Sequence, residues 1–173
     1  MAEVDGAREI PGLRVEPARA VPAAVLRYFT RTGEFAAALG AHGLTLPESG
    51  QALRAQELTL AWRSPTETLC LAATSERLTQ LHAHLGERAD GCLLELTGAL
   101  DLVALSGSRV GALLVRLAST ASLPGAGQAR RSRMADVPVL AIALDTARVQ
   151  LVLERTYSEY LLGWIDATLA DLA

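Results

Sequence analysis

The sequence predicts an α+β protein in which two pseudo-symmetric β-α-β-β-α repeats form an antiparallel-rich sheet covered by helices. Two observations support this prediction. Twice along the chain, stretches of alternating apolar residues give way to helical periodicity. Short motifs also recur, and in chain order they are Leu46-Pro47 and Gly50-Gln51-Ala52, then Leu123-Pro124 and Gly127-Gln128-Ala129. A count of two indicates a duplicated domain, because a solenoid needs three or more units.

Length and composition favour one domain over two. The chain has 173 residues, of which 50% are hydrophobic, and this is enough for one substantial core. We therefore expect residues 23–173 to form a single duplicated domain, with repeats at about 25–88 and 92–170. Residues 1–22 are rich in Pro, Arg, Glu and Ala and follow neither period. They are predicted to be a flexible or draped N-terminal leader.

The first repeat is read from its apolar spacing. Leu58, Leu60 and Trp62 alternate as in a half-buried strand, whereas the leucines after Thr74-Ser75 recur with helical spacing behind a good N-cap. The expected elements are a strand at 25–29, a helix at about 33–42, a loop at 43–55, strands at 58–62 and 69–72 joined by a turn at 63–66, and a helix carrying Leu78, Leu81 and Leu85 inward.

The second repeat is predicted in the same order. The expected elements are a strand or bent pair at 92–105 with Gly98 at the bend, a helix opening at 106–108, a loop at 119–133, a hairpin of 137–144 and 149–153, and a final helix. Thr156 and Glu159 have the spacing of a capping box for that last helix. We expect the helix to bury Tyr160, Leu161, Trp164 and Ile165 on one stripe.

Several features indicate a cytoplasmic protein. No apolar run reaches the roughly 18–20 residues that span a membrane, and the N-terminus lacks the layout of a signal peptide. Cys70 and Cys92 both lie in apolar, strand-like stretches, so we expect reduced core thiols. No membrane partner is expected.

The charged residues exclude some chemistry. All 16 basic residues are arginine, which rules out a Schiff-base lysine and a phosphate-loop lysine. The net charge of −3 gives no overall basic footprint for nucleic acid.

No constellation predicts a catalytic, cofactor-binding or metal site on this chain. His82 and His84 are two residues apart on a predicted helix and therefore point in different directions. Glu95 and Asp101 are expected to face solvent from their strands. The Gly-Ser-rich segment at 105–109 precedes a helix but lacks the further glycines of a dinucleotide loop.

The strongest local charge feature is the cluster of Arg130, Arg131 and Arg133. Two interpretations remain open: a solvated loop, or a contact with the acidic surface of a partner protein. Trp62 beside Arg63 also allows two interpretations, because this pair is typical both of a core edge and of a protein interface. These five residues are the candidate partner contacts.

Four segments of the chain, at 60–71, 103–110, 129–139 and 151–161, resemble the gamma subunits of heterotetrameric sarcosine oxidases. The first resembles their strand, turn and Asp-Glu-Trp-Leu-like strand, and the second their Leu-Ser-Gly-Pro-x-Ala segment. The third is similar to an arginine-bearing strand entry, and the fourth to a Val-x-Arg-Ser-x-Ala-x-Tyr-Leu helix start. The resemblance extends over about residues 25–170.

This resemblance implies a small non-catalytic subunit with the duplicated fold of the folate-binding aminomethyltransferase-like group. It implies large alpha and beta partners, with a delta chain as a further one, which carry FAD, FMN, NAD and tetrahydrofolate and oxidatively demethylate sarcosine. This chain would bind none of these cofactors. The alternative is a divergent folate-binding aminomethyltransferase-like protein, and a stand-alone paralogue with a pocket between the repeats also remains open.

Overall fold

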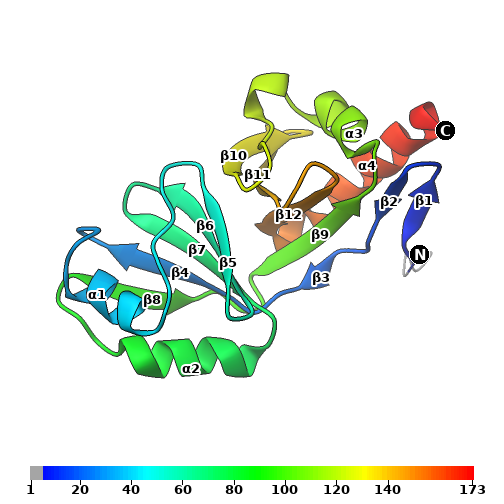
Figure 1. Ribbon diagram of the computed structural model, residues 1–173. Coiled ribbons are helices and arrows are strands. Elements are labelled where there is room, and N and C mark those ends of the chain that lie inside the picture. Colours follow the sequence, from blue (N-terminus) through cyan, green and yellow to red (C-terminus); the bar gives the residue numbers. More distant parts are fainter. Residues whose placement is uncertain (1–5) are drawn as a thin grey trace. The chain divides into compact units, whose positions relative to one another are not determined.

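The computed structural model describes residues 6–173, with two compact units and a separate sheet in each. One unit, called the inserted unit, is Val21–Gly98. The other, called the terminal unit, joins the N-terminal segment up to Ala20 to Ala99–Ala173. The expectation of one shared sheet was therefore wrong, although the α+β class and the antiparallel pairing are confirmed (Figure 1).

The inserted unit is a five-stranded antiparallel sheet in the order β5-β6-β7-β4-β8. Two helices lie against one face of it (Figure 1). Its elements are β4 (Ala23–Tyr28), α1 (Glu34–Ala41), β5 (Ala52–Ala55), β6 (Leu58–Ser64), β7 (Glu67–Ala72), α2 (Ser75–Leu85) and β8 (Gly91–Glu95).

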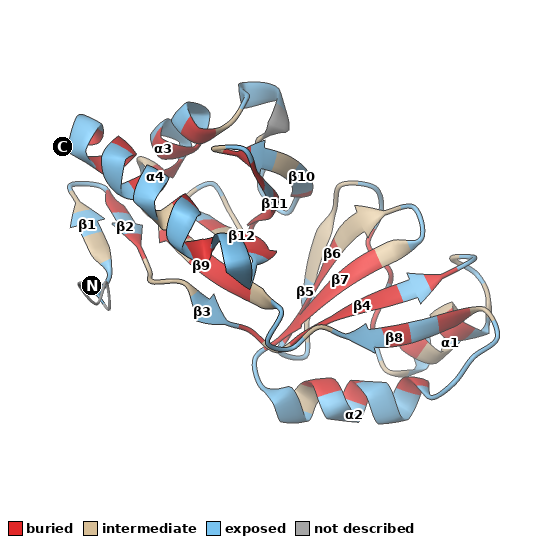
Figure 2. Cartoon of the chain, turned by 180° about the vertical axis from the view of Figure 1, so that it is seen from behind, coloured by how far each residue is buried: buried red, intermediate tan, exposed pale blue. Residues whose placement is uncertain are grey.

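The core of the inserted unit lies between that face and the helices. Leu26, Leu60 and Cys70 point from the strands toward Phe35 of α1 and Leu81 of α2, and all five are at most 2% exposed. Buried residues therefore run along the strands and along one side of α2 (Figure 2). The core is apolar because alternate residues of each strand share a face with the helical stripes.

The two helices of this unit begin in different ways. Thr74 caps α2 as predicted, since its hydroxyl accepts a hydrogen bond from the Arg77 N–H at 3.2 Å. Gly33 at the start of α1 has no side chain for this task. The carboxylate of Asp90, just before β8, accepts instead from the Phe35 N–H at 3.1 Å. A residue distant in the sequence thus satisfies a donor at the end of α1.

The terminal unit is a seven-stranded sheet in the order β1-β2-β9-β12-β11-β10, with β3 also paired to β9. The helices α3 and α4 cover one face (Figure 1). Its elements are β1 (Arg8–Ile10), β2 (Leu13–Val15), β3 (Arg19–Ala20), β9 (Leu100–Ser106), α3 (Val110–Leu117), the 3-10 turn η1 (Thr120–Ser122), β10 (Ala129–Met134), β11 (Val137–Ala143), β12 (Arg148–Glu154), the 3-10 turn η2 (Arg155–Tyr157) and α4 (Ser158–Leu172).

The core of the terminal unit also lies between sheet and helices. Val103 and Leu151 from central strands meet Leu113 of α3 and Ile165 of α4, and none of these four is exposed. The opposite face of the sheet carries further apolar residues that are at most 7% exposed, namely Leu102, Leu140, Ile142 and Val152. Both faces of this sheet are therefore apolar, which explains the near-continuous hydrophobic runs in its sequence.

Each unit contains an edge strand in a segment that was predicted to be a loop. Residues 43–55 and 119–133 were expected to be loops, but they contain β5 and the greater part of β10, respectively. Both strands lie at an edge and pair with the strand that follows them. The order β5-β6-β7-β4 of one sheet is matched by β10-β11-β12-β9 in the other.

The N-terminal segment differs most from its prediction. Residues 8–20 contain three strands instead of a flexible leader, while Met1–Asp5 lie outside the described residues. Leu13 and Val15 are 3% and 0% exposed because they fill the helix-covered core of the terminal unit. The strands are too short for a period to show in the sequence, so the segment gained its structure from pairing with β9.

The start of α4 and two polar side chains also differ from expectation. Thr156 and Glu159 form no capping box, because Arg155–Tyr157 make the turn η2 and the helix begins at Ser158. Asp101 is buried at 7% exposure, not solvent-facing, and its carboxylate accepts from Ser158 Oγ at 2.8 Å and Arg155 Nε at 3.2 Å. Cys70 is a buried free thiol as predicted, whereas Cys92 is exposed.

Within residues 6–173, no helix is both long and apolar enough to cross a membrane.

Candidate partner-binding surfaces

The three clustered arginines lie on an edge strand, not in a loop. Arg130, Arg131 and Arg133 belong to β10, which ends the sheet of the terminal unit, and all three are exposed. Arg131 is paired in register with Leu140 and Arg133 with Pro138 of β11. Because side chains alternate along a strand, Arg131 and Arg133 share the face opposite the helices and Arg130 lies on the other.

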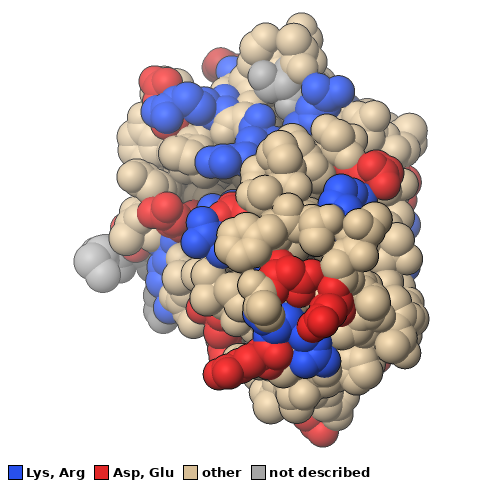
Figure 3. Space-filling view, turned by 90° about the vertical axis from the view of Figure 1, so that its left-hand side faces the viewer, with Lys and Arg blue, Asp and Glu red and all other residues tan. Residues whose placement is uncertain are grey.

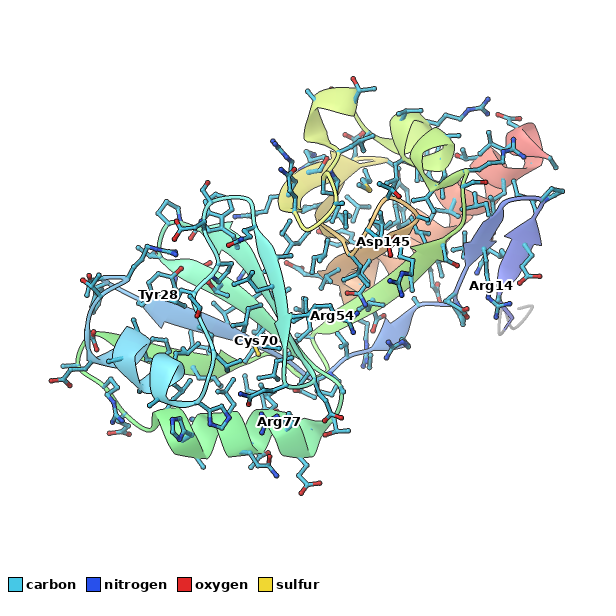
Figure 4. All side chains as sticks on the ribbon, in the orientation of Figure 1. Arg14, Tyr28, Arg54, Cys70, Arg77 and Asp145 are labelled. Atoms are coloured by element: carbon cyan, nitrogen blue, oxygen red, sulfur yellow. The ribbon has the colours of Figure 1, made fainter. Side chains whose placement is uncertain are left out.

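Arg130 and Arg131 make no ion pair with any residue that the structure describes, and Arg133 meets only Asp136 in the adjoining turn, at 3.9 Å. Other arginines are held within their unit: Arg14 binds Glu16 at 2.6 Å and Arg77 binds the Gln56 carbonyl at 3.0 Å (Figure 4). The strand β10 is therefore a local concentration of positive charge. On the face that Figure 3 displays, by contrast, basic and acidic side chains are interspersed.

Trp62 and Arg63 lie on β6 of the inserted unit, so the five candidate residues fall into two groups, one on each unit. Both side chains are half-buried. Arg63 approaches Glu67 at 3.5 Å, and the same carboxylate binds Arg27 at 2.9 Å. Trp62 alternates with Leu58 and Leu60 and so faces the helix-covered side of the sheet. This pair is partly engaged within its own unit, unlike the arginines of β10.

The sequence reasoning missed an exposed aromatic stripe on α4 and the turn before it. Tyr157, Tyr160 and Trp164 are 41%, 52% and 49% exposed, although Tyr160 and Trp164 were expected in the core. The helix buries Leu161, Ile165, Leu169 and Leu172 instead. The spacing i, i+3, i+7 of the aromatic residues places them on one flank of the helix. Large exposed aromatic side chains at this spacing are typical of a contact surface for another protein.

Among residues 6–173, Phe29 is the most exposed large apolar side chain, at 84%, and it adjoins a cavity of about 510 Å³ in the inserted unit. The cavity is open at the ends of β4 and β8 and is also lined by Arg27, Tyr28 and Arg88. Tyr28 (Figure 4) has its hydroxyl 3.1 Å from Thr68 Oγ1, so this group is already paired. The only carboxylate in the lining is Asp90, which is held by the N-terminus of α1.

Among residues 6–173, two histidines lie near each other but form no metal site with other side chains. His84 Nε2 lies 3.0 Å from the Ala38 carbonyl, and its ring lies beside that of His42, with centroids 4.4 Å apart and ring planes tilted by 36°. Burial, followed by the charges of His84 and Arg77, lowers the pKa of His42. In the part of the chain from residue 6 onward, no three His, Cys, Asp or Glu side chains are placed to hold a metal ion.

Two other groups have shifted pKa values with clear causes. Burial raises the pKa of the Cys70 thiol to about 12, so this sulfur stays protonated within the core of the inserted unit (Figure 4). The Ala147 N–H and the Arg148 guanidinium, both beside the Asp145 carboxylate, lower the pKa of that residue. Asp145 thereby stabilises the tight turn between β11 and β12, a structural task.

Residues 30–171 match the sarcosine oxidase gamma subunit family. The chain therefore belongs to this family. The match extends over most of both units and includes every residue of β10 and the aromatic stripe. No curated protein matches the sequence.

Among solved structures, the chain is similar to one from the heterotetrameric sarcosine oxidase of Corynebacterium sp. U-96 in complex with pyrrole 2-carboxylate. The two chains are 19% identical, the match covers 98% of this chain and 89% of that one, and the TM-score is 0.81. The fold is thus shared. The regulatory subunit of aspartate kinase from Thermus thermophilus is 10% identical with coverages of 89% and 98%, and its TM-score of 0.47 is too low to support an argument.

Proposed function

We propose that this chain is the structural and assembly subunit of a heterotetrameric, sarcosine oxidase-like complex that oxidatively demethylates sarcosine in the cytoplasm. The observation that supports this most is the match of residues 30–171 to the gamma subunit family. The proposed partners are the large alpha and beta chains, with a delta chain as the fourth. FAD, FMN, NAD and tetrahydrofolate belong to those partners in this proposal, and the present chain contributes contact surface.

The exposed side chains of both units support an assembly role. Tyr160 and Trp164 on α4 combine large area with few rotatable bonds, which lowers the entropic cost of binding. Phe29 beside an open cavity gives the inserted unit a second apolar contact point. Monomeric proteins rarely leave several such aromatic side chains in water, because their burial contributes free energy of association. We include Trp62, Arg63, Arg130, Arg131 and Arg133 in the proposed contact surface.

We also infer that the two units are pseudo-symmetric copies of one module. The matched strand order β5-β6-β7-β4 and β10-β11-β12-β9 supports this inference. The helices also have matched places along the chain: α1 follows β4 as α3 follows β9, and α2 follows β7 as α4 follows β12. Duplication would give one short chain two sheets and hence two separate surfaces for large partners.

The test is co-expression of the tagged full chain with the two large oxidase chains encoded in the same genome. We expect two flavin-containing chains to co-purify in fixed ratio. Trp164→Ala and Tyr160→Ala should each lower recovery of the complex by about tenfold, as expected for interface aromatic residues. Leu94→Ala is the matched control, since Leu94 is 43% exposed but belongs to β8 of the inserted unit and not to the aromatic stripe. Purification of the chain as a soluble monomer without these partners would reject the proposal.

The folate-binding hypothesis gains no specific support from the site. A pterin is usually gripped by a carboxylate, and the one carboxylate of the 510 Å³ cavity already accepts from the Phe35 N–H. Titration of the isolated chain with tetrahydrofolate by calorimetry separates the two functions. We expect no heat of binding, and saturable binding in the micromolar range would favour the alternative.

A further inference from the structure

The strand β10 has an unpaired main-chain edge as well as three arginines. In an antiparallel pair, the N–H and C=O groups of successive residues point alternately toward the partner strand and away from it. Pro138 of β11 has no N–H and is in register with Arg133. The Ala143 N–H donates to the Gln128 carbonyl, so odd-numbered residues of β11 point toward β10. It follows that Arg131 and Arg133 point their main-chain groups away from β11.

A second observation supports the conclusion that odd-numbered residues of β10 point their main-chain groups away from β11. It is the N–H of Ala135, the next odd-numbered residue. The Ala135 N–H donates to the Leu117 carbonyl at 2.8 Å, and the turn η1 lies beside β10. The segment after α3 thus covers the far end of the edge. Among residues 6–173, no backbone hydrogen bond outside the β10–β11 ladder is formed by Arg131. The open stretch is therefore centred on Arg131, where an added strand would find free donors and acceptors.

The charges of this edge decide which kind of strand fits. Arg130 and Arg131 have no carboxylate partner in the described part of the chain, and the one carboxylate at Arg133 belongs to Asp136, whose side chain is 94% exposed. A second copy of β10 would place arginines opposite arginines, which is destabilising in a cross-strand pair. A strand with Asp or Glu at alternate positions would instead present its carboxylates to Arg131 and Arg133, which share a face, and an acidic residue between them would face Arg130.

We propose that β10 binds an extended, acidic segment of a partner subunit as an additional strand of the sheet. The main chain of Arg131 supplies the ladder hydrogen bonds, and the guanidinium groups of Arg130, Arg131 and Arg133 select carboxylate side chains. This mode of recognition combines main-chain affinity with side-chain specificity. The inference rests on the proposed function, because it names the chemistry of the partner at one surface of the same assembly.

The experiment compares amide hydrogen exchange, resolved to single residues, in the free full chain and in its complex with the large oxidase chains. In the free chain the Arg131 amide should exchange fast and the Arg130 amide slowly, since only the latter points into the sheet. Formation of the complex should slow exchange at Arg131 by at least about tenfold and leave Arg130 unchanged. Unchanged exchange at Arg131 within an intact complex would overturn the strand addition but not the proposed function.

Variants separate the main-chain contribution from the charges. Arg131→Ala removes one guanidinium and keeps the N–H, whereas Arg131→Pro removes both and leaves the β10–β11 ladder intact. We expect Arg131→Pro to lower recovery of the complex several-fold more than Arg131→Ala. The double reversal of Arg131→Glu with Arg133→Glu should lower it by about tenfold or more. Slow exchange of the Arg130 amide in each variant verifies that the sheet is folded.

Arg54→Glu provides the matched control. Arg54 is likewise exposed on an edge strand, β5 of the inserted unit (Figure 4), and makes no ion pair with the described residues. Its reversal should leave recovery of the complex within twofold of the unmodified chain. Equal losses from the Arg54 and Arg131/Arg133 reversals would contradict a specific acidic partner at β10. If the unmodified chain binds no large chain at all, the proposed function fails together with this inference.

Discussion

The two sheets share a four-strand order that ends at β4 in the inserted unit and at β9 in the terminal unit. They differ in which segments of the chain pair with the free side of that last strand. In the inserted unit, β8 follows α2 directly in the chain and pairs with β4. In the terminal unit, the corresponding strand β9 is covered by β2 and β3, which come from the opposite end of the chain. The same four-strand arrangement can therefore be closed by a local segment or by a distant one. The terminal unit depends on contacts of much longer sequence separation, which cost more loop-closure entropy to form.

The chain carries one tryptophan in each unit, so the comparison can be followed by fluorescence. Trp62 lies on β6 of the inserted unit and Trp164 on α4 of the terminal unit. In a Trp62→Phe background the signal reports the terminal unit, and in a Trp164→Phe background it reports the inserted unit. Urea unfolding of each background then gives the free energy of unfolding for one unit at a time.

The largest effect is expected at Gly107, where the N-terminal hairpin docks. A Cβ at Gly107 would lie 2.2 Å from the Gly12 carbonyl oxygen, and φ is +122°. We expect Gly107→Ala to lower the free energy of unfolding of the terminal unit by about 3 kcal/mol or more, since backbone must move and the residue is strained. Urea unfolding followed through Trp164 measures this loss.

Gly127→Ala is the control for Gly107. Its φ of +72° is also positive, but no atom lies within 4 Å of the added Cβ. Only the conformational cost of about 1 kcal/mol should remain. Equal losses at the two positions would mean that the contact between the hairpin and β9 adds nothing to the stability of the terminal unit.

Gly91 tests the pairing of β8 with β4, which completes the sheet of the inserted unit. A Cβ there would lie 2.5 Å from the Phe35 ring and 2.8 Å from the Arg27 carbonyl oxygen. Gly91→Ala should destabilise the inserted unit by about 2–3 kcal/mol because Phe35 is fully buried. Unfolding followed through Trp62 measures it. Gly40→Ala on α1, where the Cβ meets no atom, should be neutral or stabilising, and a loss there would invalidate the comparison.

Asp101 tests a polar contact that ties β9 to the start of α4. Asp101→Ala removes the acceptor for the buried Ser158 hydroxyl and should destabilise the terminal unit by about 2 kcal/mol. The measurement is urea unfolding through Trp164. Glu95→Ala is the control, since Glu95 is exposed on β8 and should change stability by less than about 0.5 kcal/mol. A loss below that size for Asp101→Ala would show that water replaces its contacts.

The two helix caps of the inserted unit allow a smaller comparison of distant and local contacts. Asp90→Ala removes the acceptor for the Phe35 N–H and Thr74→Ala the acceptor for the Arg77 N–H. Each should cost about 1 kcal/mol in the free energy of unfolding measured through Trp62. If only Thr74→Ala destabilises, the distant carboxylate is not a cap for α1.

The smallest effect concerns pH. The pKa of His42 is lowered in the folded state by burial and by the nearby His84 and Arg77, so the unfolded chain binds the proton more readily. The contribution to stability is thus fully present above the unfolded pKa of about 6.5 and is lost as pH falls toward the folded value. Unfolding through Trp62 should show lower stability near pH 5.5 than near pH 7.5. His42→Gln should reduce this slope and His82→Gln, at an exposed position of α2, should not.

The apolar elements were predictable from the sequence, and the polar ones were not. The strand at 58–62, the capped helix after Thr74 and the hairpin of 137–144 and 149–153 follow from periodicity and cap chemistry, and the structure confirms them. The edge strand β10 carries almost no apolar signal, because one of its sides has no neighbouring strand. Its arginines were predicted as candidate contacts, but their position on a strand comes only from pairing with β11.

The predicted burial was wrong for side chains whose sequence pattern fits either the core face or the solvent face of an element. Tyr160 and Trp164 adjoin Leu161 and Ile165 in sequence, and all four were placed in one stripe. The helix turns only Leu161 and Ile165 inward, since an aromatic flank and a core flank differ by one position. Asp101 was expected to be exposed because alternation alone does not reveal a partner such as Ser158, which lies far along the chain. Tertiary contacts decided each of these cases.

The way the chain passes between the units has a practical consequence. Ala20 is in register with Asp101 in the β3–β9 pair, and the Ala23 carbonyl accepts from the Leu96 N–H at 2.7 Å. In each unit, the two places where the chain leaves for the other unit therefore lie on neighbouring, paired strands. In a chain without residues 21–98, a short hairpin loop would suffice to join Ala20 to Ala99, and the separated segment would offer two neighbouring attachment points.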